Sequence, residues 1–155
     1  MRKKAIPETL HWPVCALAST RRAARLLTQL YDSYLADYGI EAGQFALLMM
    51  VEHMATKGQT AIAHALGMDK TTLSRNLKVL RQRGWVESET GSGDGRRREL
   101  SLTAEGRVML TQARPGWRRA QEALRRHLKG MEWLQLLETM EGVSQAAVDA
   151  GTAKK

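Results

Sequence analysis

Apolar residues recur along the first quarter of the chain with the period of an α-helix. Ala24, Tyr31 and Tyr38 follow one another at seven-residue intervals, which predicts one helix over residues 14–38. Gly39 is expected to end this helix. Other apolar positions lie beside the stripe, so more of the helix surface is apolar than contact with a single core requires. We therefore expect a partner helix as well as a core.

Three shorter helices are predicted next. Residues Ala42–Met54 are apolar nearly all round, which is typical of a central, buried helix. Thr60 suits the N-cap of a short helix that Gly67 ends. The following helix begins after Asp69 and ends at Gly84, with leucines at i, i+4 and i+7. The last two elements form a helix, a tight glycine turn and a helix.

Alternation of apolar and polar residues then replaces the helical period. Residues 85–90 and 98–103 predict two strands of a hairpin, and residues 91–95 contain three glycines that suit its tip. The tip is followed by Arg96, Arg97 and Arg98. These residues place positive charge where an extended loop could reach the groove of a DNA duplex. We call the hairpin a wing.

Two more helices complete the pattern. A long helix is predicted from Thr103 to about Leu128, and Pro115 should kink or restart it. A final amphipathic helix follows Gly130. From Ala146 onward we expect a basic tail of small residues, with residues 149–155 frayed.

Composition narrows the class of protein. The 155 residues are 43% hydrophobic, which suits one domain-sized unit with a real core, and the net charge of +8 suits a polyanionic partner. A single cysteine and a polar start without a signal-peptide core favour the reducing cytoplasm. The longest apolar run, Ala46–Val51, is far shorter than the roughly twenty residues of a membrane span. We therefore expect no membrane association.

One helix carries a surface suited to DNA. Opposite its leucines, the helix after Asp69 presents hydroxyls, an amide and cations, which donate to phosphates and reach base edges. The predicted DNA contacts on it are Lys70, Thr71, Thr72, Ser74, Arg75, Asn76 and Lys78.

The order of these elements resembles the MarR family of winged helix-turn-helix transcription regulators. Residues Thr60–Val86 are similar to the DNA-binding unit of that family. Asp94-Gly-Arg96, followed by Leu102-Thr103 and Gly106, is similar to the family's wing signature of Asp-x-Arg and then Leu-Thr-x-x-Gly. The resemblance covers nearly the whole chain.

The resemblance implies a mostly α fold with a small β-hairpin wing and long N- and C-terminal dimerisation helices. Residues 1–40 would form the N-terminal dimerisation arm, 41–104 the winged helix-turn-helix domain, and 105–155 the C-terminal dimerisation helices and tail, all in one structural unit. A homodimer would then bind a palindromic operator. Its recognition helices would lie in the major groove, and Arg96, oriented by Asp94, would enter the minor groove. We expect a repressor that a small molecule releases.

The sequence also contains candidate residues for sensing the signal that releases the protein from DNA. Family members bind phenolic or aromatic effectors, and the residues that would line such a pocket here are Tyr31, Tyr38, Met50, His53, Met54 and Trp117. Each of them also suits the hydrophobic core. One branch of the family senses hydroperoxides through a cysteine early in the first helix, where this chain has Cys15. The sequence favours a buried structural thiol at Cys15 over a peroxide sensor.

Other classes find less support. The four histidines lack the spacing of metal ligands, so we expect no metal and no cofactor. The chain contains no nucleophile elbow, phosphate-binding glycine loop or nucleotide fingerprint, so we expect no enzyme activity. The alternative that remains is an architectural protein that binds nucleic acid without sequence preference.

Overall fold

Helices make up most of the structure, in the order that the apolar periodicity predicts. The computed structural model describes residues 15–54, 58–90 and 98–153. Its elements are α1 (Ala16–Leu35), the 3-10 helix η1 (Ala36–Tyr38), α2 (Ala42–Met54), α3 (Gly58–Ala65), α4 (Lys70–Gln82), β1 (Val86–Thr90), β2 (Arg98–Leu102), α5 (Ala104–His127) and α6 (Trp133–Thr152). The chain divides into two compact units, the first ending at Trp117 and the second beginning at Arg118. The expected functional division at residues 40 and 104 stays a prediction.

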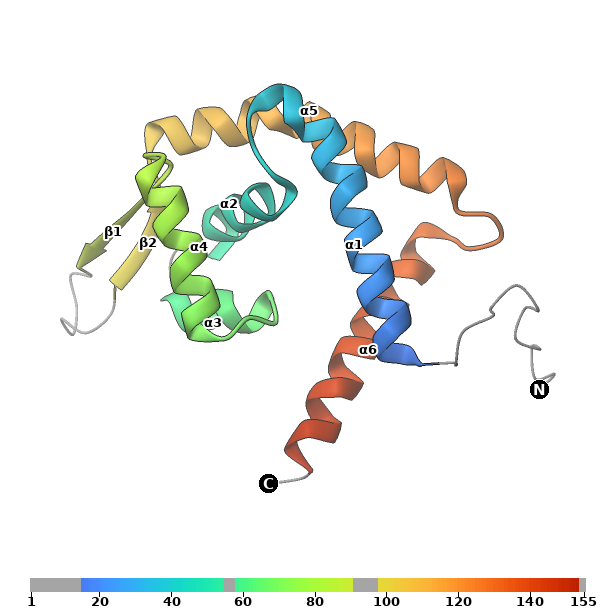
Figure 1. Ribbon diagram of the computed structural model, residues 1–155. Helices are drawn as coiled ribbons and strands as arrows, with labels where there is room; N and C mark the ends of the chain where they lie inside the picture. Colours follow the sequence, from blue (N-terminus) through green and yellow to red (C-terminus); the bar gives the residue numbers. More distant parts are fainter. Residues whose placement is uncertain (1–14, 55–57, 91–97, 154–155) are drawn as a thin grey trace. The chain divides into compact units, whose positions relative to one another are not determined.

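Helix α2 is the hydrophobic centre of the first unit, as its all-round apolar pattern predicts. Phe45, Leu48 and Val51 are almost completely buried, and the three leucines of α4 join the same core. Helix α2 contacts α1, α3 and β2, while α4 packs against α3 and β1 (Figure 1). An ion pair of 3.1 Å between Glu52 and Arg114 also joins α2 to α5. The helix-turn-helix and the hairpin therefore share one core.

The predicted hairpin is present, and its two strands pair in antiparallel orientation. Val86 pairs with Leu102, and Ser88 pairs with Leu100. Val86, Leu100 and Leu102 are buried, so the apolar face of the hairpin covers the core. This packing fixes the base of the wing beside α4.

The base of the hairpin is held by Thr103, at the start of α5. The Thr103 hydroxyl donates to the carbonyl of Gly84 at 2.6 Å and accepts from the backbone N–H of Gly106 at 3.0 Å. Gly106 lies so close to the backbone of Trp85 that an added Cβ would overlap with the Trp85 carbonyl oxygen. The spacing Leu-Thr-x-x-Gly in the sequence therefore corresponds to a tight junction between the hairpin, the end of α4 and the start of α5.

The second unit contains the last part of α5 and the whole of α6. The guanidinium of Arg125 lies 5.5 Å from the ring centre of Trp133, a cation–π contact between the end of α5 and the start of α6. No residue of α6 is buried, and most of its large apolar residues are exposed, Leu134 by 70%. The apolar stripe that the sequence predicts on this helix is thus present and uncovered.

Three boundaries differ from the sequence-based expectations. Helix α3 begins at Gly58, so Thr60 lies within the helix and is not its N-cap. Helix α6 continues to Thr152, so the expected tail from Ala146 is helical. Alanine is the strongest helix former, and the small residues at 146, 147 and 150 are alanines. Helix α5 continues through Pro115 without restarting.

We predict that Gly106→Ala destabilises the protein by about 2 kcal/mol or more, because the new methyl group meets rigid backbone at Trp85. Urea denaturation followed by circular dichroism measures the free energy of unfolding. Gly43→Ala in α2 is the matched control, since a Cβ there has no neighbour within 4 Å among the described residues. Equal stability of the two variants would contradict the proposed close approach.

Candidate nucleic-acid interface

Helix α4 begins at a well-formed cap. The carboxylate of Asp69 accepts from the backbone N–H of Thr72 at 2.8 Å and from its hydroxyl at 2.7 Å. These hydrogen bonds from Thr72 lower the pKa of Asp69 below its ordinary value of 3.8. The N-cap predicted from the sequence is confirmed, and the ionised carboxylate also stabilises the positive end of the helix dipole.

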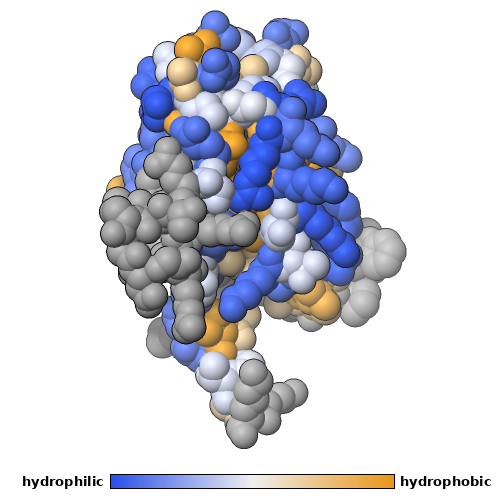
Figure 2. All heavy atoms as spheres, turned by 90° about the vertical axis from the view of Figure 1, so that its left-hand side faces the viewer, coloured by the Kyte–Doolittle hydropathy of each residue, from blue (hydrophilic) through white to orange (hydrophobic). Residues whose placement is uncertain are grey.

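The predicted DNA contacts share the outer surface of α4. All seven of them are exposed, whereas Leu73, Leu77 and Leu80 on the opposite side are buried. The side of the molecule that carries α4 and the hairpin is largely hydrophilic (Figure 2). The amphipathic pattern therefore separates a core face from a polar, cationic face, as the sequence predicts.

Two of these seven side chains are already engaged within the protein. The hydroxyl of Thr72 donates to Asp69, and the amide nitrogen of Asn76 donates to the thioether sulfur of Met68 at 3.7 Å. Met68 lies in the turn between α3 and α4 and packs partly against the core. No sequence signal pointed to this contact. Within the described part of the chain, the polar groups of Arg75 and Lys78 have no hydrogen-bond or ion-pair partner, so both cations are free to meet an anion.

The end of α4 is anchored by a residue that sequence reasoning missed. Arg83 donates to the carbonyl of Gly39 at 3.0 Å, and its guanidinium lies 5.0 Å from the ring centre of Trp85. The contact with Gly39 spans 44 residues, so no local pattern reveals it. Arg83 therefore ties α4 to the turn before α2, and it has a structural role.

Most of the predicted wing contacts lie outside the described residues. Asp94, Arg96 and Arg97 belong to residues 91–97, of which the structure describes nothing. Arg98 is the first residue of β2 and pairs with Thr90 in the hairpin register. The wing contacts therefore stay predictions.

The predicted effector residues lie on α1, η1, α2 and α5 of the first unit. Tyr31, Tyr38, Met50, Met54 and Trp117 are partly buried and pack against the core, whereas His53 is exposed. The ring of Trp117 stacks on Phe45 with 6.0 Å between ring centres. Burial raises the pKa of Tyr31 above its ordinary value. These side chains have a place in the core, and an effector site among them stays a prediction.

Cys15 differs from expectation. It is exposed at the N-terminal boundary of α1, so the favoured interpretation of a buried structural thiol is wrong. Among the residues that the structure describes, nothing covers the first turns of α1, as the 67% exposure of Leu17 also shows.

The described residues offer neither a metal site nor a membrane span. Among them, no three His, Cys, Asp or Glu residues gather in an arrangement that could hold a metal ion. None of the described helices is both long enough and apolar enough to cross a bilayer.

Comparisons with known proteins agree with this architecture. The family model of the MarR family matches residues 38–97. The transcriptional regulator HosA of Escherichia coli O111:H- is 30% identical over 132 residues, which cover 80% of this chain and 98% of HosA. The M. tuberculosis transcriptional regulator MosR, solved in complex with DNA, superposes with a TM-score of 0.80 at 34% identity over 88% of this chain and 98% of MosR. The regulator PecS of Dickeya dadantii is 25% identical, and the match spans only 61% of its length.

The helix-turn-helix of α3 and α4, followed by the two-stranded hairpin, defines a winged helix-turn-helix protein. The chain belongs to the MarR family of transcriptional regulators.

We predict that Asp69→Ala lowers the thermal midpoint at neutral pH, because it removes the cap of α4. The folded pKa of Asp69 lies below the unfolded one, so its stabilisation is present above the unfolded pKa and is lost as the pH falls through the folded pKa. The thermal midpoints of the unaltered protein and of Asp69→Ala should therefore converge at acidic pH. Thermal melts at several pH values measure this convergence. Asp69→Asn is the control, since it keeps an uncharged acceptor. If the thermal midpoints of the unaltered protein and of Asp69→Ala differed by the same amount down to acidic pH, the role of the ionised carboxylate would be contradicted.

Proposed function

We propose that the protein is a homodimeric, sequence-specific repressor that binds a palindromic operator in duplex DNA and is released by a small phenolic or aromatic molecule. The observation that carries the proposal is the outer face of α4, where exposed hydroxyls, an amide and unpaired cations stand on a helix fixed at both ends. Such a face combines phosphate donors with groups that discriminate base edges.

Arg75 and Lys78 have separate roles in this proposal. Arg75 lies near the middle of α4 and offers the planar donor pair that matches guanine in the major groove. Lys78, one turn further along, donates to a phosphate. The arginines of the wing extend the contact into the adjacent minor groove, with Asp94 orienting Arg96. MosR, which is 34% identical to this chain, was solved in complex with DNA, and this supports DNA as the partner.

The dimer joins the first and last helices of two copies. Its support is the exposed apolar surface of α1 and α6, which a monomer would leave in water. Two recognition helices related by a twofold axis then meet half-sites about one helical turn apart.

The first test is selection of DNA by the purified protein from a randomised duplex pool, over a series of salt concentrations. An enriched inverted repeat with half-sites about one turn apart is the expected result. Binding that falls with salt and enriches no sequence would instead support an architectural protein.

We predict that Arg75→Ala loses about tenfold or more of the preference for the selected operator over scrambled DNA, because base contacts contribute to that preference. Fluorescence anisotropy with both duplexes measures the preference. Sedimentation should show an unchanged oligomeric state. Arg126→Ala, at the exposed end of α5, is the matched control and should keep the preference. An Arg75→Ala protein that still selects its operator would remove Arg75 from the base-contacting set.

Release of the protein from DNA requires a ligand that binds more tightly to the conformation unable to bind DNA. A ligand with equal affinity for both conformations would not shift the equilibrium between them. The effector set of Tyr31, Tyr38, Met50, His53, Met54 and Trp117 has the aromatic and thioether character that suits a phenolic ligand. A peroxide sensor is the second candidate, and the exposure of Cys15 to solvent favours it.

We predict that a phenolic compound lowers operator affinity in the anisotropy assay, and that His53→Ala requires more of the compound for the same loss. Cys15→Ser should respond as the unaltered protein does. The opposite result is that a hydroperoxide releases the protein from DNA, that Cys15→Ser does not respond to it, and that phenolic compounds have no effect. This result would overturn the phenolic hypothesis in favour of a peroxide sensor.

A further inference from the structure

The turn between α3 and α4 places a methionine beside the helix that we propose contacts DNA. Gly67 ends α3 with a φ of +61°, and its N–H donates to the carbonyl of His64 at 3.0 Å. The N–H of Met68 donates to the carbonyl of Ala63 at 2.8 Å. These two bonds form a Schellman motif, in which the residue after the glycine commonly packs back on the helix. Met68 has this position, and its side chain packs partly against the core of the first unit.

The sulfur of Met68 also contacts α4 directly. The amide nitrogen of Asn76 lies 3.7 Å from this sulfur and donates a hydrogen bond to it. A thioether is a weak acceptor and the only polar group of a methionine side chain. Met68 is half-buried, so a small molecule in water can reach it in the folded protein. One reactive sulfur therefore joins the turn to the exposed face of α4.

We propose that Met68 is an oxidation site through which a peroxide weakens the binding of DNA. This inference rests on the proposed binding of operator DNA, and it adds a chemical signal that acts without Cys15. The sulfur attacks one oxygen of hydrogen peroxide, so that an S–O bond forms and the O–O bond breaks. The proton of the transferred hydroxyl passes to the leaving hydroxide, which becomes water. The sulfur is oxidised by two electrons to a sulfoxide, and the peroxide is reduced.

The sulfoxide fits this position less well than the thioether for two reasons. It is polar, so contact with the apolar core becomes unfavourable. The sulfur is already only 3.7 Å from the Asn76 nitrogen, so an oxygen added on that side would lie closer than the roughly 2.9 Å of a hydrogen bond. Either effect displaces the turn relative to α4. Because Asp69, the cap of α4, is the next residue after Met68, the displacement reaches the start of the proposed DNA-contacting helix.

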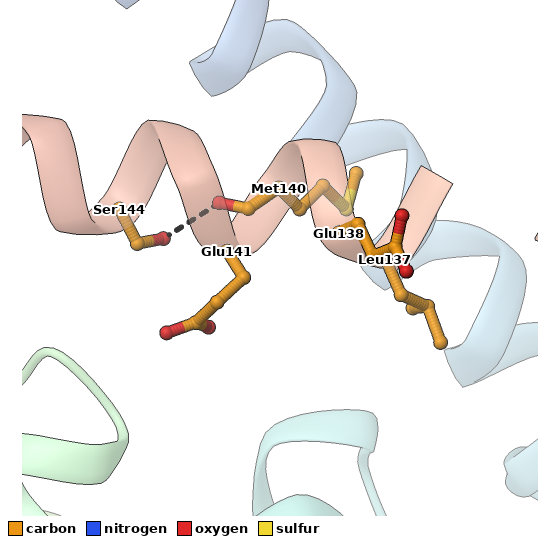
Figure 3. Close-up of a pocket in the computed structure, with 5 residues that line it drawn as sticks. All are labelled: Leu137, Glu138, Met140, Glu141 and Ser144. Atoms are coloured by element: carbon orange, nitrogen blue, oxygen red, sulfur yellow. Dashed lines mark hydrogen bonds between the residues drawn. The ribbon is translucent and has the colours of Figure 1, made fainter. Parts of the chain in front are cut away.

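More exposed methionines allow a specific effect of Met68 to be distinguished from general oxidation. Met131 is 40% exposed and Met140 is 41% exposed, so a peroxide reaches both more easily than the half-buried Met68. Met140 lies on a shallow surface of α6 together with Leu137, Glu138, Glu141 and Ser144 (Figure 3). Both exposed methionines belong to the second unit, whereas Met68 and α4 belong to the first. The feature that distinguishes Met68 is thus its contact with α4.

The test uses the Cys15→Ser protein, in which this thiol cannot respond. The protein is treated with increasing amounts of hydrogen peroxide, and catalase removes the excess. Peptide mass spectrometry measures the oxidised fraction at each methionine, and fluorescence anisotropy measures the affinity for the selected operator. We expect this affinity to fall at least about tenfold once Met68 is oxidised. Methionine sulfoxide reductases A and B with a thiol reductant should restore the affinity, because together they reduce both sulfoxide epimers.

Two further variants in the Cys15→Ser background locate the effect. Met68→Leu keeps an apolar side chain of similar volume and lacks the sulfur, so peroxide should leave its own untreated affinity unchanged. Met140→Leu is the matched control and should lose affinity on oxidation as the Cys15→Ser protein does. Circular dichroism before and after treatment should show the same helical content in all three proteins.

The inference would be overturned if oxidation of Met68 left the affinity unchanged, or if the affinity fell while Met68 stayed unmodified. Protection by Met140→Leu instead of Met68→Leu would overturn it as well, and so would a loss of helical content in step with the loss of affinity. The proposed DNA-binding function fails in a different way, namely if the untreated protein binds no duplex from the randomised pool.

Discussion

The close approach of two backbone segments, at Gly106 and Trp85, is the constraint on which the first unit depends. Only a residue without a Cβ fits at Gly106, and the Thr103 hydroxyl holds the segments together by bonding to both sides of the junction. The end of α4, the base of the hairpin and the first turn of α5 consequently meet at one place. Helix α4 and the base of the hairpin are therefore joined at one junction, and α5 begins directly at it.

Helix α4 is also fixed at its two ends by side-chain contacts. A charged cap at Asp69 starts α4, and Arg83 just past its end bonds to the Gly39 carbonyl and stacks on Trp85. The helix between these anchors buries its leucines, and among the described residues Arg75 and Lys78 have no hydrogen-bond or ion-pair partner. Preorganisation of this kind reduces the conformational entropy that binding would otherwise cost.

Features with a local cause could be predicted from the sequence. The leucine spacing of α4, the cap at Asp69 and the positive φ of Gly39, Gly67 and Gly84 each depend on residues a few positions apart. Contacts over long sequence separations, such as Arg83 with Gly39, leave no periodic signal. The exposure of Cys15 was missed because burial depends on what covers a helix, which its own pattern does not state. The end of α6 differs from the expectation because a run of small residues suggests a tail, whereas the alanines in it favour a helix.

The cap of α4 has a consequence for the chemistry of the outer face of this helix, which we propose contacts DNA. A threonine hydroxyl ordinarily both donates and accepts, so it tolerates either kind of neighbour. The hydrogen of the Thr72 hydroxyl is committed to the Asp69 carboxylate, which leaves only lone pairs toward the outside. In a major groove this oxygen would favour the exocyclic amino groups of adenine and cytosine and disfavour the carbonyl oxygens of guanine and thymine. A cap that begins the helix thus also converts one of its side chains into an acceptor of fixed polarity.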